Sequence, residues 1–131
     1  MQNRDNNFET LIGHAKSMLG RSYEGLKRKY LHYPISLTVH LENKILEKVI
    51  EIRFSEQQAT TSLDFDQTDE CTAVYLFFDT QNDENSFIEY LAKSYDFDFR
   101  KNCWIMANCY LKIKPSKYEI AFLFYEKCIE R

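Results

Sequence analysis

Two short runs of side chains have types and spacings that could support chemistry, and the first lies in an alternating segment. Thr38, His40 and Glu42 would share the polar face of one strand. A histidine beside a carboxylate can act in general acid–base catalysis, and a nearby hydroxyl can act as a nucleophile. Polar strand faces commonly carry such residues, and His14 and His32 fall in a helical segment and at a helix-to-strand corner. We therefore predict that the protein is not an enzyme.

The second run is an Asp-Phe-Asp tripeptide that occurs at 64–66 and again at 96–98. The first copy extends to Asp64-x-Asp66-x-x-Asp69-Glu70, an oxygen-rich spacing that can bind calcium or magnesium. It lacks the glycine and the distal glutamate of an EF-hand loop. The alternative is a strand edge with its phenylalanine inward and its carboxylates outward. We predict this alternative, with no metal and no cofactor.

Glycine and cysteine usage excludes further classes of site. The three glycines all lie before Leu26, so neither a P-loop nor a dinucleotide-binding fingerprint is present. The four cysteines are far apart and form no C-x-x-C pair, which favours buried, reduced thiols over a zinc site. The N-terminal residues are polar, and the chain has no apolar run of membrane-spanning length. These features predict a cytoplasmic protein that does not bind membranes.

The formal net charge of -3 conceals a segregation of charge along the chain. Residues 1–33 carry +3, residues 34–54 carry 0, residues 55–99 carry -10 and residues 100–131 carry +4. The overall balance lacks the basic excess of a nucleic-acid binder. The acidic middle segment would complement a basic protein partner, such as a toxin domain or a nuclease. The carboxylates that we expect in such a surface are Asp64, Asp66, Asp69, Glu70, Asp79, Asp83, Glu84, Asp96 and Asp98.

Hydrophobic periodicity predicts helices and strands in alternating blocks. Apolar residues recur at three- and four-residue steps from Phe8 to Tyr30, which indicates an amphipathic helix. Gly20 and Gly25 predict a kink or a split near residue 20, and Pro34 ends the segment. Strands are expected at 35–41, 50–54, 63–65 and 74–78, although 45–50 would also suit a helical turn. A second helix is expected from Asn82 to about residue 95, and a long hairpin follows, with strands at 103–113 and 118–128.

These elements predict one α+β domain over residues 1–131. We expect an antiparallel sheet of about six strands, with two helices packed on one face, in the order α-β-β-β-β-α-β-β. Two helices cover only one face of such a sheet, and the final hairpin is apolar on both faces. The residues expected on the uncovered face are Trp104, Met106, Tyr110, Leu123 and Tyr125. They would form a ligand pocket, a partner interface or a second core.

No motif in the chain identifies a family, so the functional hypotheses rest on charge and shape. The first is a protein-binding module, most concretely an immunity-type inhibitor whose acidic surface caps a basic toxin. The second is a cone-shaped domain resembling the nuclear-transport-factor-2-like shape, with a cavity of roughly 300 Å³ or more beside Trp104. The third is an acidic secretion chaperone, which would be a homodimer. The sequence leaves the oligomeric state open.

Overall fold

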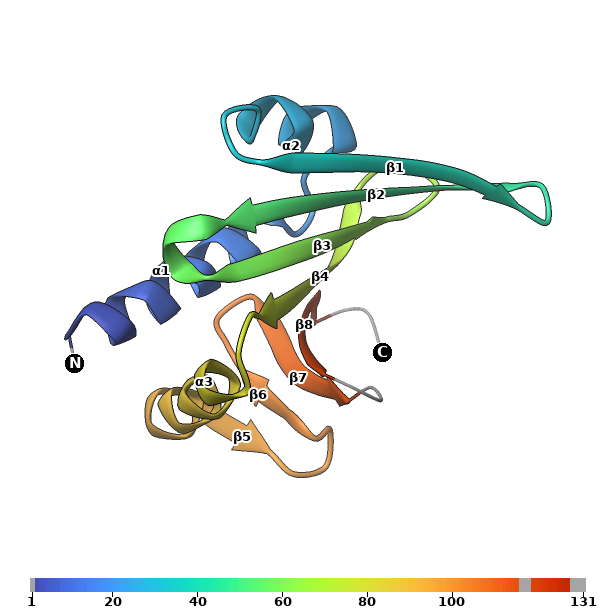
Figure 1. The fold of residues 1–131 in the computed structure, drawn as a ribbon. Coiled ribbons are helices and arrows are strands. Elements are labelled where there is room, and N and C mark those ends of the chain that lie inside the picture. The colour runs from blue at the N-terminus through green and yellow to red at the C-terminus, as the bar shows by residue number, and fades with distance from the viewer. Residues whose placement is uncertain (1, 116–118, 128–131) are drawn as a thin grey trace.

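The computed structural model describes residues 2–115 and 119–127, and its centre is a single eight-stranded antiparallel sheet (Figure 1). The strands lie in the order β1-β2-β3-β4-β8-β7-β6-β5. The first four are β1 (Ile35–Glu42), β2 (Ile45–Phe54), β3 (Ala59–Phe65) and β4 (Cys71–Phe78). The others are β5 (Asp96–Asp98), β6 (Cys103–Ile105), β7 (Cys109–Pro115) and β8 (Ile120–Glu126). The helices are α1 (Gln2–Met18), α2 (Tyr23–Lys29) and α3 (Gln81–Ser94), with a short 3-10 turn at Ser55–Gln57.

The α+β class and the antiparallel sheet are confirmed, whereas the expected number and order of elements are wrong in detail. The described chain has eight strands rather than six and three helices rather than two. The ambiguous segment from residue 45 belongs to strand β2. Of the expected 118–128 strand, residues 118 and 128 lie outside the described residues, as do 116 and 117 of the expected turn.

The additional helix arises where the sequence predicted a break. Gly20 has a φ of +82°, a conformation that glycine adopts at little cost, and its backbone N–H donates to Cys71 O at 2.8 Å. The new helix α2 starts at Tyr23 and is capped by Ser22, whose Oγ accepts a hydrogen bond from the backbone N–H of Gly25. The predicted split near residue 20 is therefore confirmed.

One additional strand is β5, at the second Asp-Phe-Asp tripeptide, and the other arises because the predicted 103–113 strand is interrupted. Strand β6 ends at Ile105, and the chain reverses so that the backbone N–H of Met106 donates to Cys109 O at 3.0 Å. Trp104 then pairs with Leu111, across the two strands of a tight hairpin. The turn changes which residues share a face. Trp104 is paired with Leu111, an inward-facing residue of β7, so Trp104 also faces inward.

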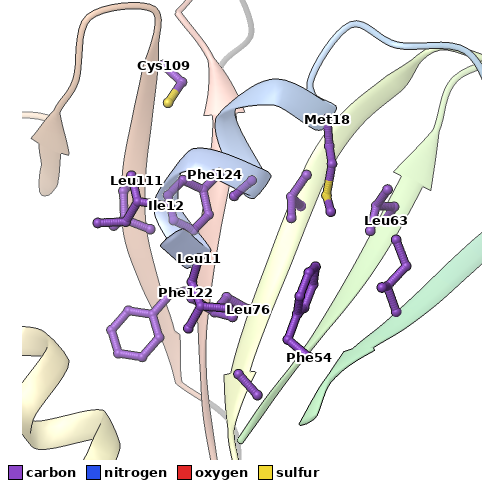
Figure 2. Packing of buried hydrophobic residues seen from close by; sticks show 14 of the residues in the cluster. Leu11, Ile12, Met18, Phe54, Leu63, Leu76, Cys109, Leu111, Phe122 and Phe124 are labelled. Atoms are coloured by element: carbon purple, nitrogen blue, oxygen red, sulfur yellow. The ribbon is translucent and has the colours of Figure 1, made fainter. Parts of the chain in front are cut away.

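One buried cluster joins all three helices to the inward face of the sheet. Figure 2 shows Leu11 and Ile12 of α1 lying over Leu76, Phe122 and Phe124 of the central strands. A group of aromatic rings extends this packing toward α3. The Phe122 ring centroid lies 4.8 Å from that of Phe87 and 5.8 Å from that of Phe78, both edge-to-face. The helices therefore cover one face, and the ring cluster anchors α3 to the sheet.

A smaller cluster lies on the opposite face of β4 and β8. Ala73, Leu123 and Tyr125 are buried there, with Tyr75 and Tyr110 packed against them. The Tyr110 and Tyr125 ring centroids are 5.6 Å apart, and Lys112 Nζ lies 5.5 Å from the Tyr125 ring centroid. Large side chains from neighbouring strands thus shield this face, which no described helix covers. In the described ranges, no helix is long and apolar enough to cross a membrane.

His14 of α1 lies among aromatic rings at the junction between α1, α2 and β2. Its Nδ1 is 2.8 Å from the Tyr30 hydroxyl oxygen, and its ring centroid is 4.8 Å from that of Phe54. Burial, with a smaller contribution from the charge of Lys29, lowers the pKa of His14 below 6.5. The folded protein therefore holds this imidazole neutral at pH values where the unfolded chain protonates it.

We expect the free energy of unfolding to be pH-dependent through His14. A lowered histidine pKa stabilises the fold fully above pH 6.5, and this contribution is lost as the pH falls toward the folded pKa. Urea unfolding at stepped pH values between neutral and mildly acidic conditions should show this decline. His14→Phe should flatten it, whereas His40→Gln on the exposed β1–β2 hairpin should leave it in place. An equal slope in wild type and His14→Phe would contradict the assignment.

Candidate functional site

A cavity of about 730 Å³ lies beside Trp104. It lies where the C-terminal end of α3 faces the far end of the sheet at β5, β6 and β7 (Figure 1). Its volume is within the usual range for small-molecule sites. Its lining residues are Ala92, Tyr95, Asp96, Phe97, Phe99, Asn102, Trp104, Ile113 and Pro115. Most of this lining is aromatic or apolar.

Tyr95 forms one wall at the point where α3 ends. Its backbone N–H donates to Leu91 O, and its hydroxyl donates to a Glu9 carboxylate oxygen at 3.3 Å. The Tyr90 hydroxyl donates to the same carboxylate oxygen. Burial and the charge of Glu9 raise the pKa of Tyr95 to about 12, so the phenol is neutral at physiological pH. The polar end of Tyr95 is thus engaged by α1, and its ring presents an apolar surface to the cavity.

The turn between β5 and β6 forms the opposite rim. Asp98 Oδ1 accepts hydrogen bonds from the backbone N–H groups of Arg100 and Lys101, at 2.9 and 3.2 Å. Asn102 follows with a φ of +56°, a left-handed conformation that asparagine tolerates well. This turn leaves Phe99 88% exposed at the rim. An aromatic side chain is therefore displayed to solvent by a hydrogen-bonded turn.

Aromatic rings continue from the rim into the cavity. The Phe97 ring centroid is 5.0 Å from that of Phe99 and 5.0 Å from that of Trp104, with edge-to-face interplanar angles of 72° and 74°. Phe97 and Trp104 are also cross-strand partners on β5 and β6. Edge-to-face packing of this kind fixes the rings relative to one another. The result is a series of aromatic surfaces against which a flat ligand can pack.

The polar groups of the cavity are few. The Asp96 carboxylate accepts hydrogen bonds, and the Asn102 amide both donates and accepts them. Among the described lining residues there is no histidine, cysteine, serine or lysine. The site therefore offers shape, aromatic contact and a hydrogen-bond acceptor, whereas a nucleophile with its base is not part of the described lining.

The structure divides the predicted acidic surface into separate groups. Asp64, Asp66, Asp69 and Glu70 lie together at the turn between β3 and β4. Lys48 Nζ donates to Asp69 Oδ2 at 2.9 Å. Asp66 accepts from the Thr68 hydroxyl and from the backbone N–H groups of Thr68 and Glu70, and these bonds lower its pKa. Part of this group is thus engaged within the turn.

The second acidic group lies at the other end of β4, near the start of α3. Arg53 makes two hydrogen bonds of 2.7 Å to the Asp79 carboxylate, which lower the pKa of that group. Arg4 lies 3.6 Å from Asp83, and Glu84 is buried. The eight residues of β4 separate this group from the first by about 25 Å. Asp96 and Asp98 are on β5, at the sheet edge opposite β1.

The five residues expected on one uncovered face are also divided. Trp104 and Met106 belong to the main core under the helices, whereas Tyr110, Leu123 and Tyr125 belong to the smaller cluster on the opposite face. The expectation of a shared face is wrong because the turn after Ile105 interrupts the strand. Of these five, only Trp104 lines the cavity. Tyr95, Phe97 and Phe99 were not predicted as site residues, although aromatic residues at alternate positions of an acidic segment were a usable signal.

The other chemically suggestive residues remain apart. His40 Nε2 lies 3.1 Å from Glu47 Oε2, across the exposed β1–β2 hairpin. Within residues 2–115 and 119–127, no cluster of three or more His, Cys, Asp or Glu side chains could hold a metal ion. Cys71, Cys103 and Cys109 are buried, and Cys128 lies outside the described residues. Burial raises the pKa of Cys109 to about 11, which disfavours its reactive thiolate form.

Comparison with known proteins identified no relative of this chain. No protein-family model matches the chain, and no match was found to a curated protein or to a solved structure.

Proposed function

We propose that the protein is a non-catalytic binding protein whose site is the aromatic cavity beside Trp104. Its ligand is a small, planar and largely apolar molecule that carries a hydrogen-bond donor. The observation that carries this proposal is the cavity of about 730 Å³ with Trp104, Phe97, Phe99 and Tyr95 in its lining. Such a cavity is the feature that distinguishes the ligand-binding hypothesis from the other two.

The lining also supports the class of ligand. Phe99 is exposed and Phe97 is half-buried, so their rings are accessible for stacking with a flat ligand, and the edge-to-face contact holds Phe97 against the buried Trp104. The Asp96 carboxylate accepts hydrogen bonds and repels an anion, so it favours a donor group such as an amine. A neutral Tyr95 ring adds an apolar wall. Together these groups select against a carboxylate-bearing ligand of the same shape.

Trp104 gives a direct readout, because it is the only tryptophan in the chain. Titration with 2-naphthylamine should change Trp104 emission in a saturable manner. Naphthalene, which lacks the donor, should bind more weakly, and 2-naphthoate should bind most weakly because its carboxylate faces Asp96. Ala92→Phe adds a ring at the edge of the cavity and should reduce naphthylamine affinity at least tenfold, or about 1.4 kcal/mol.

Lys93→Phe is the matched control for this variant. It adds the same ring to the next residue of α3, which does not line the cavity, and should leave the affinity unchanged. If none of the three compounds gives a saturable change, the proposal fails. Equal affinities in wild type and Ala92→Phe would also overturn it, because binding would then lie elsewhere.

The immunity-type inhibitor stays a prediction, and the geometry lends it little support. Its premise was one exposed acidic surface, whereas the described carboxylates lie at both ends of β4 and on β5. Arg4, Lys48 and Arg53 pair with three of them. These ion pairs leave less unpaired charge to attract a basic partner.

A further inference from the structure

The outer strand of the sheet at β1 has the features of an unprotected edge. β1 contains eight residues, all paired with β2 in one unbroken register, and no described strand pairs with its other side. Protein sheets usually protect such edges with lysine, proline, bulges or very short strands. β5, at the opposite edge, is only three residues long. β1 is long and regular, and it contains neither lysine nor proline.

The backbone geometry shows which groups of β1 face outward. Asn43 and Lys44 both have positive φ angles, so they form a two-residue turn closed by a hydrogen-bonded pair at Glu42 and Ile45. From this pair onward, hydrogen-bonded and non-hydrogen-bonded residue pairs alternate along β1 and β2. The hydrogen bond from Arg53 N to Pro34 O, at 2.9 Å, fits this alternation. The N–H and C=O groups that point away from β2 therefore belong to Ile35, Leu37, Val39 and Leu41.

Side chains of these same residues form an exposed apolar stripe. Leu37, Val39 and Leu41 are 45%, 52% and 68% exposed. Leu46, the cross-strand partner of Leu41, is also exposed and lies on the same face. The hairpin that carries this stripe extends beyond the helices (Figure 1). Unpaired backbone groups and apolar side chains are thus offered along one edge.

The stripe is complementary to itself. When two β1 strands pair antiparallel about Val39, Leu37 of each lies opposite Leu41 of the other, and Thr38 lies opposite His40. The outward backbone groups of Leu37, Val39 and Leu41 then meet those of Leu41, Val39 and Leu37 of the second copy, which gives about six new hydrogen bonds. Among these pairs no like charges lie opposite each other. A strand from an unrelated protein would need to match this pattern, whereas a second copy already carries it.

We infer that two copies of this chain associate through their β1 strands, with the two-fold axis at Val39, to form one continuous sheet. The cavity beside Trp104 lies near the opposite edge of the sheet, so the association leaves it open. The inference is independent of the proposed ligand, because it rests on different strands and different side chains.

Light scattering after size exclusion, over a range of concentrations up to high micromolar, should give a mass of twice 15.7 kDa. Val39→Glu should convert the protein to a monomer. In the monomer its carboxylate would face Lys48, the cross-strand partner of Val39, but in the dimer two carboxylates would meet at the axis. Thr38→Glu adds the same charge to the other face of β1, opposite His40 of the second copy, and should leave the dimer intact.

Amide hydrogen exchange by NMR provides a second measurement. The N–H groups of Leu37, Val39 and Leu41 should be protected in the wild-type dimer and should exchange rapidly in Val39→Glu, with amides of β2 protected in both. A monomeric wild type at every concentration would overturn the inference. So would a Val39→Glu protein that still dimerises, or a dimer that only Thr38→Glu disrupts. A dimer that lacks protection at these three amides would place the interface elsewhere and would also overturn it.

Discussion

Replacing Phe122 with alanine is expected to lower the free energy of unfolding by about 3–5 kcal/mol. Phe122 lies on β8 with no exposed surface, and its ring contacts the edges and faces of Phe78 and Phe87. Removal of the ring loses its burial and leaves a cavity between α3 and the sheet. Because the surrounding rings come from a strand and a helix held by other contacts, the space can close only in part.

The effect should be visible in both thermal and denaturant unfolding. For a chain of this length, such a loss corresponds to a decrease of roughly 10–20 °C in the melting temperature. Phe99→Ala makes the same chemical change at the exposed rim of the cavity, and it should alter stability by no more than about 0.5 kcal/mol. A loss below about 1 kcal/mol for Phe122→Ala would mean that α3 does not pack on β8 as described.

The elements that the sequence predicted best are those whose boundaries have local causes. Gly20 marked the break between α1 and α2, where its φ is positive. The start of α3 was predicted within one residue, because Asp83 and Glu84 suit the first turn of a helix. In the structure the Thr80 side chain caps this helix by accepting a hydrogen bond from Asp83 N. Helix breaks and helix starts of this kind can be predicted from the sequence because they depend only on neighbouring residues.

The interruption after Ile105 could not be predicted in the same way. Residues 103–107 are continuously apolar, and the segment through Asn108 contains neither glycine nor proline, so nothing in it marks a turn. The turn is set by tertiary pairing, since β7 continues the sheet from β8 and β6 folds back against it. One unrecognised turn reversed the assignment of faces, which is why Trp104 was predicted on the wrong side of the sheet.

The candidate site shows the same division between local and long-range information. A pocket was one of three alternatives for the face expected to carry Trp104, and the structure has a cavity beside Trp104 whose walls come from α3, β5, β6 and β7. The strand edge predicted for Asp96-Phe97-Asp98 is β5, but its pairing with β6 was not predicted, so Phe97 was not placed beside Trp104. For the acidic groups, the sequence indicated on which element each carboxylate lies. It did not indicate that Arg53 pairs with Asp79, because that contact depends on the register of three strands.

The second large effect is expected from Leu123→Ala, which should lower the free energy of unfolding by about 2–4 kcal/mol. Leu123 has no exposed surface, although it lies on the face of the sheet that no described helix covers. Its cross-strand partners are Tyr75 on one side and Lys112 on the other, and Tyr110 packs against the same cluster. If these long side chains form a real core, truncation of Leu123 leaves a cavity beneath them.

The alternative is that the tyrosines and Lys112 move inward and fill the space, since they are only partly buried and have room to rotate. Leu111→Ala on the helix-covered face of β7 is the matched comparison, because it deletes the same atoms from a fully buried position. Leu31→Ala makes the same substitution at an exposed position, and it should lower the free energy of unfolding by less than about 0.5 kcal/mol. A Leu123→Ala loss close to that of Leu111→Ala would establish a second core made by the sheet alone. A loss close to that of Leu31→Ala would instead show that the tyrosine layer is a loose surface, and the two faces of β8 would then contribute very unequally to stability.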